Sequence, residues 1–216
     1  MKKIKLIILD FDGTLADTRG LIVKTMQQTL EALGLESRTD EQCASMIGLP
    51  LKQAFTDLIP MSDEMGVQCV ETYRKIFNEN NALYVIPTFP HVMETLYKLH
   101  EQGYILTIAS SRSNRSLREF VNDMDLNDVI PYVLGAEDVT RAKPHPDPVL
   151  QTLETFGCKA EDALVVGDTW YDIEMGKRAG VKTCGVTYGN GTREELMQAG
   201  ADYLVDDFGK LPLIAM

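Results

Sequence analysis

The sequence predicts an α/β fold: a doubly wound parallel sheet with helices on both faces and a helical domain inserted after the first strand. Residues 6–9 form an unbroken apolar run, which is typical of a strand buried on both faces. From residue 87 onward, strand and helix patterns alternate, as in repeated βα units. Between about residues 18 and 81, apolar side chains recur only at helical spacing. We therefore expect residues 1–16 and 84–216 to form the core domain and residues 17–83 the helical domain.

The expected helical domain contains four amphipathic stretches. Asp17 or Thr18 can cap the first helix, and Gly34 follows its last turn. Ser62 can cap the longest helix, whose apolar stripe continues to Phe77. We interpret these stripes as the core of the domain. The helices are expected, in order, at residues 18–33, 41–47, 51–59 and 62–77.

The expected core domain alternates strands with helices. Pro148 suits the first residue of a helix, and Gly180 suits the position just beyond a helix end. Thr192, followed three residues later by Glu195, predicts a capping box. The later strands are expected at residues 104–109, 132–134, 163–166, 183–186 and 203–205, and the helices at 90–101, 114–123, 148–156, 171–178 and from 192.

The composition limits the classes of function. The formal charge of −11, from 32 acids and 21 bases, predicts no nucleic-acid or membrane partner, because both need an extended basic surface. The N-terminus lacks a signal-peptide cleavage site and the four cysteines form no closely spaced pair, so we expect a cytoplasmic protein without zinc or disulfides. We expect a monomer or weak dimer. A small anionic ligand is compatible with this charge if a metal or local cations attract it.

Two carboxylates follow the first strand. Side chains alternate along an extended segment, so Asp10 and Asp12 should point the same way, and Gly13 then permits a sharp turn. Two neighbouring carboxylates repel each other unless a cation lies nearby. A hard divalent ion such as Mg²⁺ prefers such oxygen ligands. The alternative is a surface turn with solvated acids.

Hydroxyls and a lysine follow two later strands. Ligands of doubly wound sheets bind beyond the carboxyl ends of the strands, so residues at these ends are candidates. Ser110 and Ser111 follow the strand expected at 104–109, and Lys143 lies in a proline-containing loop after the next strand. These groups suit a phosphoryl ligand. A helix-capping serine and a solvated lysine are the alternatives.

Two further acids follow the strand expected at 163–166. Asp168 is the natural third oxygen ligand for an ion at Asp10, together with the main-chain carbonyl of Asp12. Asp172 can bind the ion through water or orient Lys143. It can equally be a first-turn acid that the helix dipole stabilises.

These residues resemble the four signatures of the haloacid dehalogenase-like hydrolases, in the order of that family. The resemblance covers essentially the whole chain, and it implies a Rossmann-like core with a helical C1 cap domain where the helical insertion lies. The matching residues are Asp10-Phe11-Asp12-Gly13-Thr14-Leu15, Ser110, Lys143-Pro144 and Gly167-Asp168-Thr169 with Asp172.

The resemblance implies a Mg²⁺-dependent phosphatase that acts on a small phosphorylated metabolite. By the resemblance, Asp10 is the nucleophile that forms an aspartyl-phosphate, and Asp12 is the general acid and base. Ser110 and Lys143, with Ser111 beside them, would bind the phosphoryl group. Asp10, Asp12 through its carbonyl, and Asp168 would hold Mg²⁺, with Asp172 close by.

The C-terminal motifs look most like those of phosphoglycolate phosphatases. A β-phosphoglucomutase-like mutase and a pyrophosphatase are the enzyme alternatives. Residues 47–52 match the glycine-containing specificity segment of the cap, so Gly48 and Lys52 are candidate substrate contacts, but the arginine typical of the mutases is absent. The non-enzyme alternative is a phospho-accepting receiver domain, which is shorter and has no helical insertion.

Overall fold

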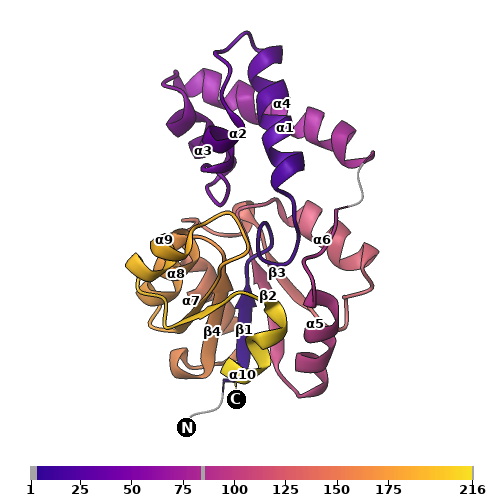
Figure 1. Cartoon of the computed structure of the whole chain (residues 1–216), viewed down its shortest axis with the longest axis vertical. Coiled ribbons are helices and arrows are strands. Elements are labelled where there is room, and N and C mark those ends of the chain that lie inside the picture. The colour runs from indigo at the N-terminus through magenta and orange to yellow at the C-terminus, as the bar shows by residue number, and fades with distance from the viewer. Residues whose placement is uncertain (1–3, 84–85, 216) are drawn as a thin grey trace.

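The computed structural model describes residues 4–83 and 86–215 and contains one six-stranded parallel sheet (Figure 1). The strand order is β3-β2-β1-β4-β5-β6. This order, with helices on both faces, confirms the doubly wound fold. The strands are β1 (Leu6–Leu9), β2 (Ile105–Ala109), β3 (Tyr132–Leu134), β4 (Ala163–Gly167), β5 (Lys182–Val186) and β6 (Tyr203–Val205).

The first strand lies at the centre of the sheet because all four of its side chains are apolar and buried. Leu9 pairs with Ile108 of β2 on one side and with Val166 of β4 on the other. The strand order reverses direction between β1 and β4, and doubly wound folds bind their ligands at such a point. The residues that follow β1 and β4 are therefore placed next to each other at the binding edge.

Helices cover both faces of the sheet. Ile7 and Leu9 belong to the apolar cluster under α5, α6 and α10, whereas Leu6 and Ile8 belong to the cluster under α7 and α8. This alternation is what a strand buried on both faces requires. The helices of this domain are α5 (Val92–Glu101), α6 (Asn114–Asp123), α7 (Asp147–Phe156), α8 (Trp170–Arg178), α9 (Arg193–Gln198) and α10 (Leu211–Ala215).

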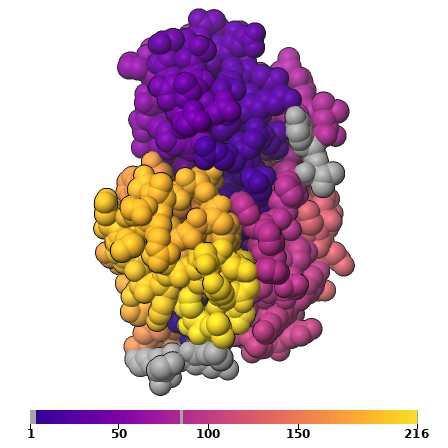
Figure 2. Space-filling model, viewed as in Figure 1, coloured from indigo at the N-terminus to yellow at the C-terminus, as the bar shows by residue number. Residues whose placement is uncertain are grey.

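Residues 19–81 form a helical block that lies beyond the carboxyl end of the sheet (Figures 1 and 2). The block has an apolar core of its own, in which Phe55 and Cys69 are fully buried. Ser62 caps the longest helix, since its hydroxyl accepts a hydrogen bond from the main-chain N–H of Met65 at 3.2 Å. Its helices are α1 (Arg19–Ala32), α2 (Asp40–Ala44), α3 (Leu51–Leu58) and α4 (Asp63–Asn81).

The segments that enter and leave the helical block run side by side. Ala16 forms an antiparallel bridge with Thr88. The N–H of Asp17 donates to the carbonyl of Pro87 at 2.9 Å, and the N–H of Phe89 donates to the carbonyl of Leu15 at 3.1 Å. Both ends of the block are thus attached at one place beside β1.

Several helix boundaries differ from the sequence-based predictions for local reasons. Thr18 occupies the N-cap position of α1, but its hydroxyl bonds to Asp12 instead of capping the helix. Helix α5 begins at Val92, not at residue 90, because His91 adopts a left-handed conformation with φ 64°. Helix α2 ends at Ala44, and α7 begins one residue before Pro148. The capping box of Thr192 and Glu195 is confirmed. Among the described residues, no helix is both long and apolar enough to cross a membrane.

Candidate active site at the carboxyl end of the sheet

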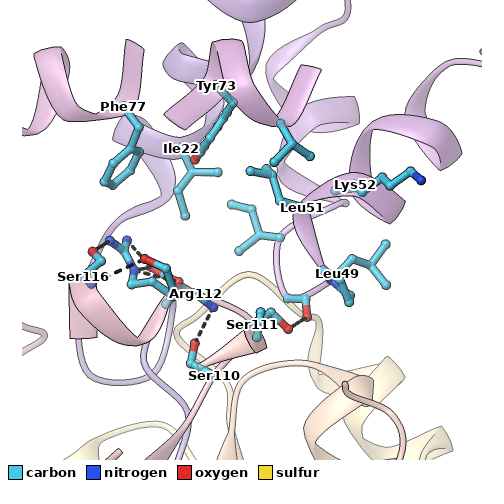
Figure 3. A pocket seen from close by; sticks show the side chains of 18 of the residues that line it. Ile22, Leu49, Leu51, Lys52, Tyr73, Phe77, Ser110, Ser111, Arg112 and Ser116 are labelled. Atoms are coloured by element: carbon cyan, nitrogen blue, oxygen red, sulfur yellow. Dashed lines mark hydrogen bonds and ion pairs between the residues drawn. The ribbon is translucent and has the colours of Figure 1, made fainter. Parts of the chain in front are cut away.

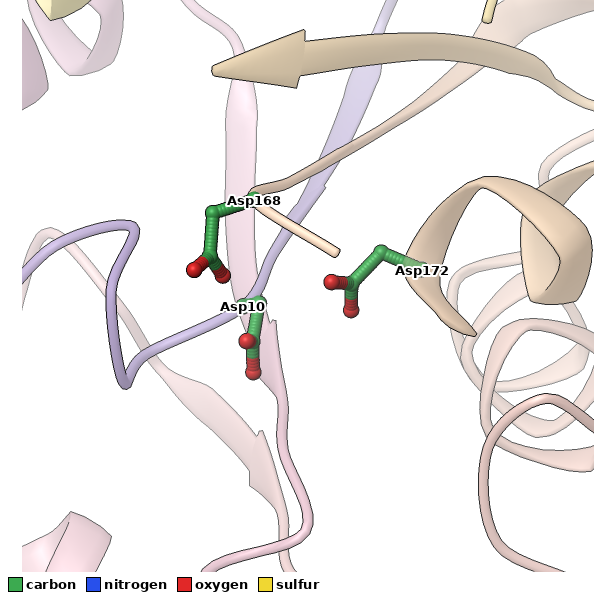
Figure 4. A group of neighbouring side chains, drawn as sticks. All are labelled: Asp10, Asp168 and Asp172. Atoms are coloured by element: carbon green, nitrogen blue, oxygen red, sulfur yellow. The ribbon is translucent and has the colours of Figure 1, made fainter. Parts of the chain in front are cut away.

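Three buried carboxylates converge beyond the ends of β1 and β4 (Figure 4). Asp10 directly follows β1, Asp168 directly follows β4, and Asp172 lies in the first turn of α8. Each offers an oxygen atom, and these atoms lie within 4.8 Å of one another. The structure therefore brings together three of the acids singled out in the sequence.

Lys143 lies between two of these acids. Its Nζ atom is 2.6 Å from Oδ1 of Asp10 and 2.6 Å from Oδ1 of Asp172, and the residue is only 3% exposed. Burial alone would lower the pKa of the ammonium, but the two carboxylates raise it above its usual value. Lys143 is therefore a fixed positive charge beside Asp10. The alternative of a solvated loop lysine is wrong.

Asp172 has both of the structural functions considered for it. One of its oxygens accepts from Lys143, and the other accepts from the main-chain N–H of Thr169 at 3.1 Å and from its hydroxyl at 2.7 Å. The Thr169 contacts form a capping box that begins α8. Asp172 thus fixes the lysine to the start of the helix.

Two glycine-containing loops, one after β1 and one after β5, hold Asp168 in place. Its Oδ2 accepts from the main-chain N–H of Asn190 at 2.6 Å and from the side-chain amide of Asn190 at 3.1 Å. Its Oδ1 accepts from the hydroxyl of Thr14 at 3.2 Å. Gly13 is required beside it: φ is +84°, and a Cβ there would lie 2.1 Å from Asp168 Oδ2.

The charge balance of this cluster fits a divalent cation. When ionised, the carboxylates of Asp10, Asp168 and Asp172 carry three negative charges, and the ammonium of Lys143 carries one positive charge. Within the described part of this cluster, two negative charges therefore have no cation to balance them. Burial is the main cause that raises the pKa of Asp10 to about 7, and burial also raises the pKa of Asp168. A hard cation with oxygen ligands such as Mg²⁺ would compensate both carboxylates. Asp10 and Asp168 are the candidate ligands, because both oxygens of Asp172 are already bonded to Lys143 and Thr169.

The carboxylate of Asp12 is not part of this cluster. Its Oδ1 accepts from Nη2 of Arg112 at 2.6 Å and from the hydroxyl of Thr18 at 2.7 Å, while Nε of Arg112 lies 3.2 Å from both carboxylate oxygens. The guanidinium is also 5.0 Å from the ring centres of Phe11 and Phe77. Arg112 thus links Phe11 and Asp12 of the core to Phe77 on helix α4 of the helical block.

The two serines after β2 have different environments. Ser110 is buried, borders the cavity, and accepts a 3.4 Å hydrogen bond from the main-chain N–H of Arg112. The hydroxyl of Ser111 donates to the carbonyl of Gly48 at 2.7 Å, so it connects the core to the helical block. Within the described chain, the hydroxyl of Ser111 is thus bonded to the helical block, whereas the hydroxyl of Ser110 is not.

A cavity of about 330 Å³ lies between the core and the helical block (Figure 3). Its floor is polar and includes Asp10, Asp12 and Ser110. Its roof, which we define as the lining residues between positions 22 and 78, is largely apolar. Lys52 borders the cavity, but its ammonium pairs with Asp63. The floor thus places the candidate nucleophile at the base of a space large enough for a small molecule.

Sequence reasoning missed two residues of this site. Arg112 follows Ser110 and Ser111 at the end of β2, so the strand-end rule could have identified it. Asn190 lies between Gly189 and Gly191 in the loop after β5. Neither position carries a motif that predicts its partner, because each partner comes from a distant part of the chain.

Comparison with known proteins identifies the family of the chain. The family model described as haloacid dehalogenase-like hydrolase matches residues 7–186. The chain belongs to this family. A crystal structure of a hydrolase of this family from Bacteroides fragilis is 29% identical, has a TM-score of 0.87, and matches 97% of this chain and 100% of that chain.

Curated relatives of the hydrolase match it over nearly its whole length. "Probable phosphatase IndB" of Dickeya dadantii is 35% identical over 95% of this chain and 91% of its own. A phosphoglycolate phosphatase of Aquifex aeolicus is 34% identical over 86% and 85%. Pyrophosphatase PpaX of Anoxybacillus flavithermus is 33% identical over 96% and 95%. All three names describe enzymes that hydrolyse a phosphate ester or a phosphate anhydride, and the named substrates differ.

Proposed function

We propose that this hydrolase is a phosphatase that cleaves small phosphomonoesters through an aspartyl-phosphate at Asp10. The observation that carries the proposal is the position of Asp10, whose carboxylate lies beside Lys143 and Asp168 at the floor of the cavity. A carboxylate in such a place can attack phosphorus, and the neighbouring positive charge offsets the repulsion between two anions. The names of the relatives support the same class of reaction.

The remaining floor residues have separate roles in the proposal. Mg²⁺, when bound by Asp10 and Asp168, would neutralise the carboxylates and polarise the phosphoryl oxygens. Lys143 and Ser110 would bind oxygens of the transferring phosphoryl group, and the contact of Lys143 with Asp172 keeps its ammonium in position. The two residues hold the phosphoryl group in line with the Asp10 carboxylate.

Asp12 is the proposed general acid and base. It lies on the same segment as Asp10, borders the cavity, and is held by Arg112 and Thr18. From this position it would give a proton to the leaving alkoxide and then take one from the water that hydrolyses the aspartyl-phosphate. The helical block would act as a cap that keeps bulk water from this step.

The structure offers the mutase alternative little support. A phosphosugar mutase must hold a second phosphate, but the arginine typical of the mutases is absent from residues 47–52, and Lys52 in that segment is paired with Asp63. A receiver domain has no helical insertion after its first strand, whereas this chain has one over residues 19–81. We therefore take hydrolysis as the reaction.

Turnover of p-nitrophenyl phosphate, measured with Mg²⁺ and with EDTA, tests the proposal. We expect many turnovers per protein molecule with Mg²⁺ and a loss of activity in EDTA, because Asp10 and Asp168 would lack their cation. Release of at most one equivalent of product per molecule would indicate a phospho-accepting module. Absence of any Mg²⁺-dependent turnover would contradict the proposal.

Replacement of Asp12 by Asn tests the acid and base role. The amide oxygen can still accept from Arg112, so we expect the fold and Mg²⁺ binding to be retained. The amide cannot transfer the proton, and kcat should fall by about 10²–10⁴-fold with an alkyl phosphate, whose leaving group needs protonation. Steady-state kinetics and calorimetric Mg²⁺ titration measure the two effects. Unchanged kcat with the alkyl phosphate would refute the role.

A further inference from the structure

The cavity has a polar floor and a roof of apolar side chains. Figure 3 shows Ile22, Leu51 and Phe77 extending from the helical block towards Ser110 and Arg112 below. The block also contributes Met26, Leu49 and Val70 to the lining. Ile22, Leu51, Val70 and Phe77 are only partly buried although they face the cavity. Apolar surface is therefore available directly above the position proposed for the phosphoryl group.

The polar side chains of the roof are Lys52, Tyr73, Arg74 and Asn78. Tyr73 is 8% exposed, and its hydroxyl is directed into the cavity (Figure 3). No hydrogen bond joins this hydroxyl to another residue of the described chain. Burial raises the pKa of the phenol, so the group remains a neutral hydrogen-bond donor. The hydroxyl is not among the fully buried polar atoms that lack a partner, so water or a polar atom of the substrate can complete its hydrogen bonding.

Two of the cations that border the cavity, Arg112 and Lys52, are paired with carboxylates. Arg112 is paired with Asp12 and also bonds to Ser116, and Lys52 is paired with Asp63. Arg74 borders the cavity but is exposed to solvent. Except beside Arg74, a second anionic group on the substrate would thus meet mostly apolar carbon above the floor, at a cost in desolvation.

We propose that the alcohol part of the substrate is a carbon-rich, uncharged body that the roof buries, with at most a single polar atom near Tyr73. This inference rests on the proposed phosphatase function and specifies its substrate class. Burial of apolar surface on the roof would supply the binding energy that positions the ester above Asp10. Sugar phosphates and esters with a second anion would be poor substrates, because the roof offers them few polar partners.

A series of n-alkyl phosphates from methyl to hexyl tests the proposal. Their leaving alkoxides have nearly the same basicity, so differences in kcat/KM report contacts with the roof. We expect kcat/KM to rise about fourfold for each of the first few methylenes, the value that follows from burial of one CH₂. Hexyl phosphate should also exceed phosphoglycolate, glucose 6-phosphate and pyrophosphate in kcat/KM.

Two matched variants on α4 locate the effect. Val70→Thr places a hydroxyl in the roof, and we expect roughly a tenfold lower kcat/KM for hexyl phosphate and a shallower dependence on chain length. Val67→Thr is the same change on the exposed side of α4, and it should leave the series unchanged. A flat or falling series in the wild-type protein, or a preference for phosphoglycolate, glucose 6-phosphate or pyrophosphate, would overturn the inference. Those results would leave the phosphatase function intact, whereas failure to hydrolyse any ester, including p-nitrophenyl phosphate, would contradict the proposed function itself.

Discussion

Asp10→Asn is expected to reduce Mg²⁺-dependent hydrolysis of p-nitrophenyl phosphate by more than about a thousandfold. An amide cannot form the aspartyl-phosphate, and it is a weaker ligand for a cation than a carboxylate. The fold should be retained, because Lys143 keeps its second partner, Asp172. Initial rates with excess substrate measure the effect.

The thermal midpoint of the same variant provides an independent test. Burial raises the pKa of Asp10 from its ordinary value of 3.8 to about 7. The unfolded chain therefore loses this proton at lower pH than the folded protein, so Asp10 lowers the stability as the pH rises from 3.8 to about 7, and the full loss is present above pH 7. Without Mg²⁺ at neutral or alkaline pH, Asp10→Asn should therefore melt at the same or a higher temperature than the wild type. Asp17→Asn, the same change at an exposed acid, is the control and should keep full activity. Substantial turnover by Asp10→Asn would exclude Asp10 as the nucleophile.

Lys143→Met should lower the free energy of unfolding by about 3–5 kcal/mol in EDTA, which is the usual cost of removing one partner from a buried ion pair. The ammonium lies 2.6 Å from both Asp10 and Asp172, and all three groups are buried. Its removal leaves three carboxylates together with no basic side chain between them. Urea denaturation followed by circular dichroism measures the change.

Two companion variants show whether charge is the cause. Asp172→Asn added to Lys143→Met removes one of the stranded carboxylates and should recover part of the lost stability, since the two sites are in contact. Lys159→Met changes an exposed lysine in the same way and should have little effect. If Lys143→Met were as stable as Lys159→Met, the charge balance described for the cluster would be incorrect.

The sequence predicts the sheet and its ligand edge well because both depend on simple patterns. The apolar run of β1 identifies a central strand, and the rule that strand ends carry ligands selects Asp10, Ser110 and Asp168. Parallel strands place these ends along one edge whatever the details of the loops are. The convergence of the acids follows from topology alone.

The pairing of side chains across the site could not be predicted in the same way. Thr18 has the sequence position of a helix cap, but Asp12 lies close enough to take its hydroxyl. Arg112 pairs with Asp12 across the ends of β2 and β1, and Lys52 of α3 pairs with Asp63 of α4, so each pair depends on how separate elements pack. Such choices are made by tertiary packing, and no local propensity encodes them.

The paired entry and exit of the helical block, where Ala16 bridges Thr88, make the insertion a detachable module. A short turn joining these two neighbouring positions would close the core without disturbing the order of its strands. Exchange of the whole block would thus replace the roof of the cavity while Asp10, Lys143 and Asp168 stay on an intact scaffold. The carboxylate cluster and the apolar roof of the cavity thus lie on two parts of one polypeptide, each with a hydrophobic core of its own.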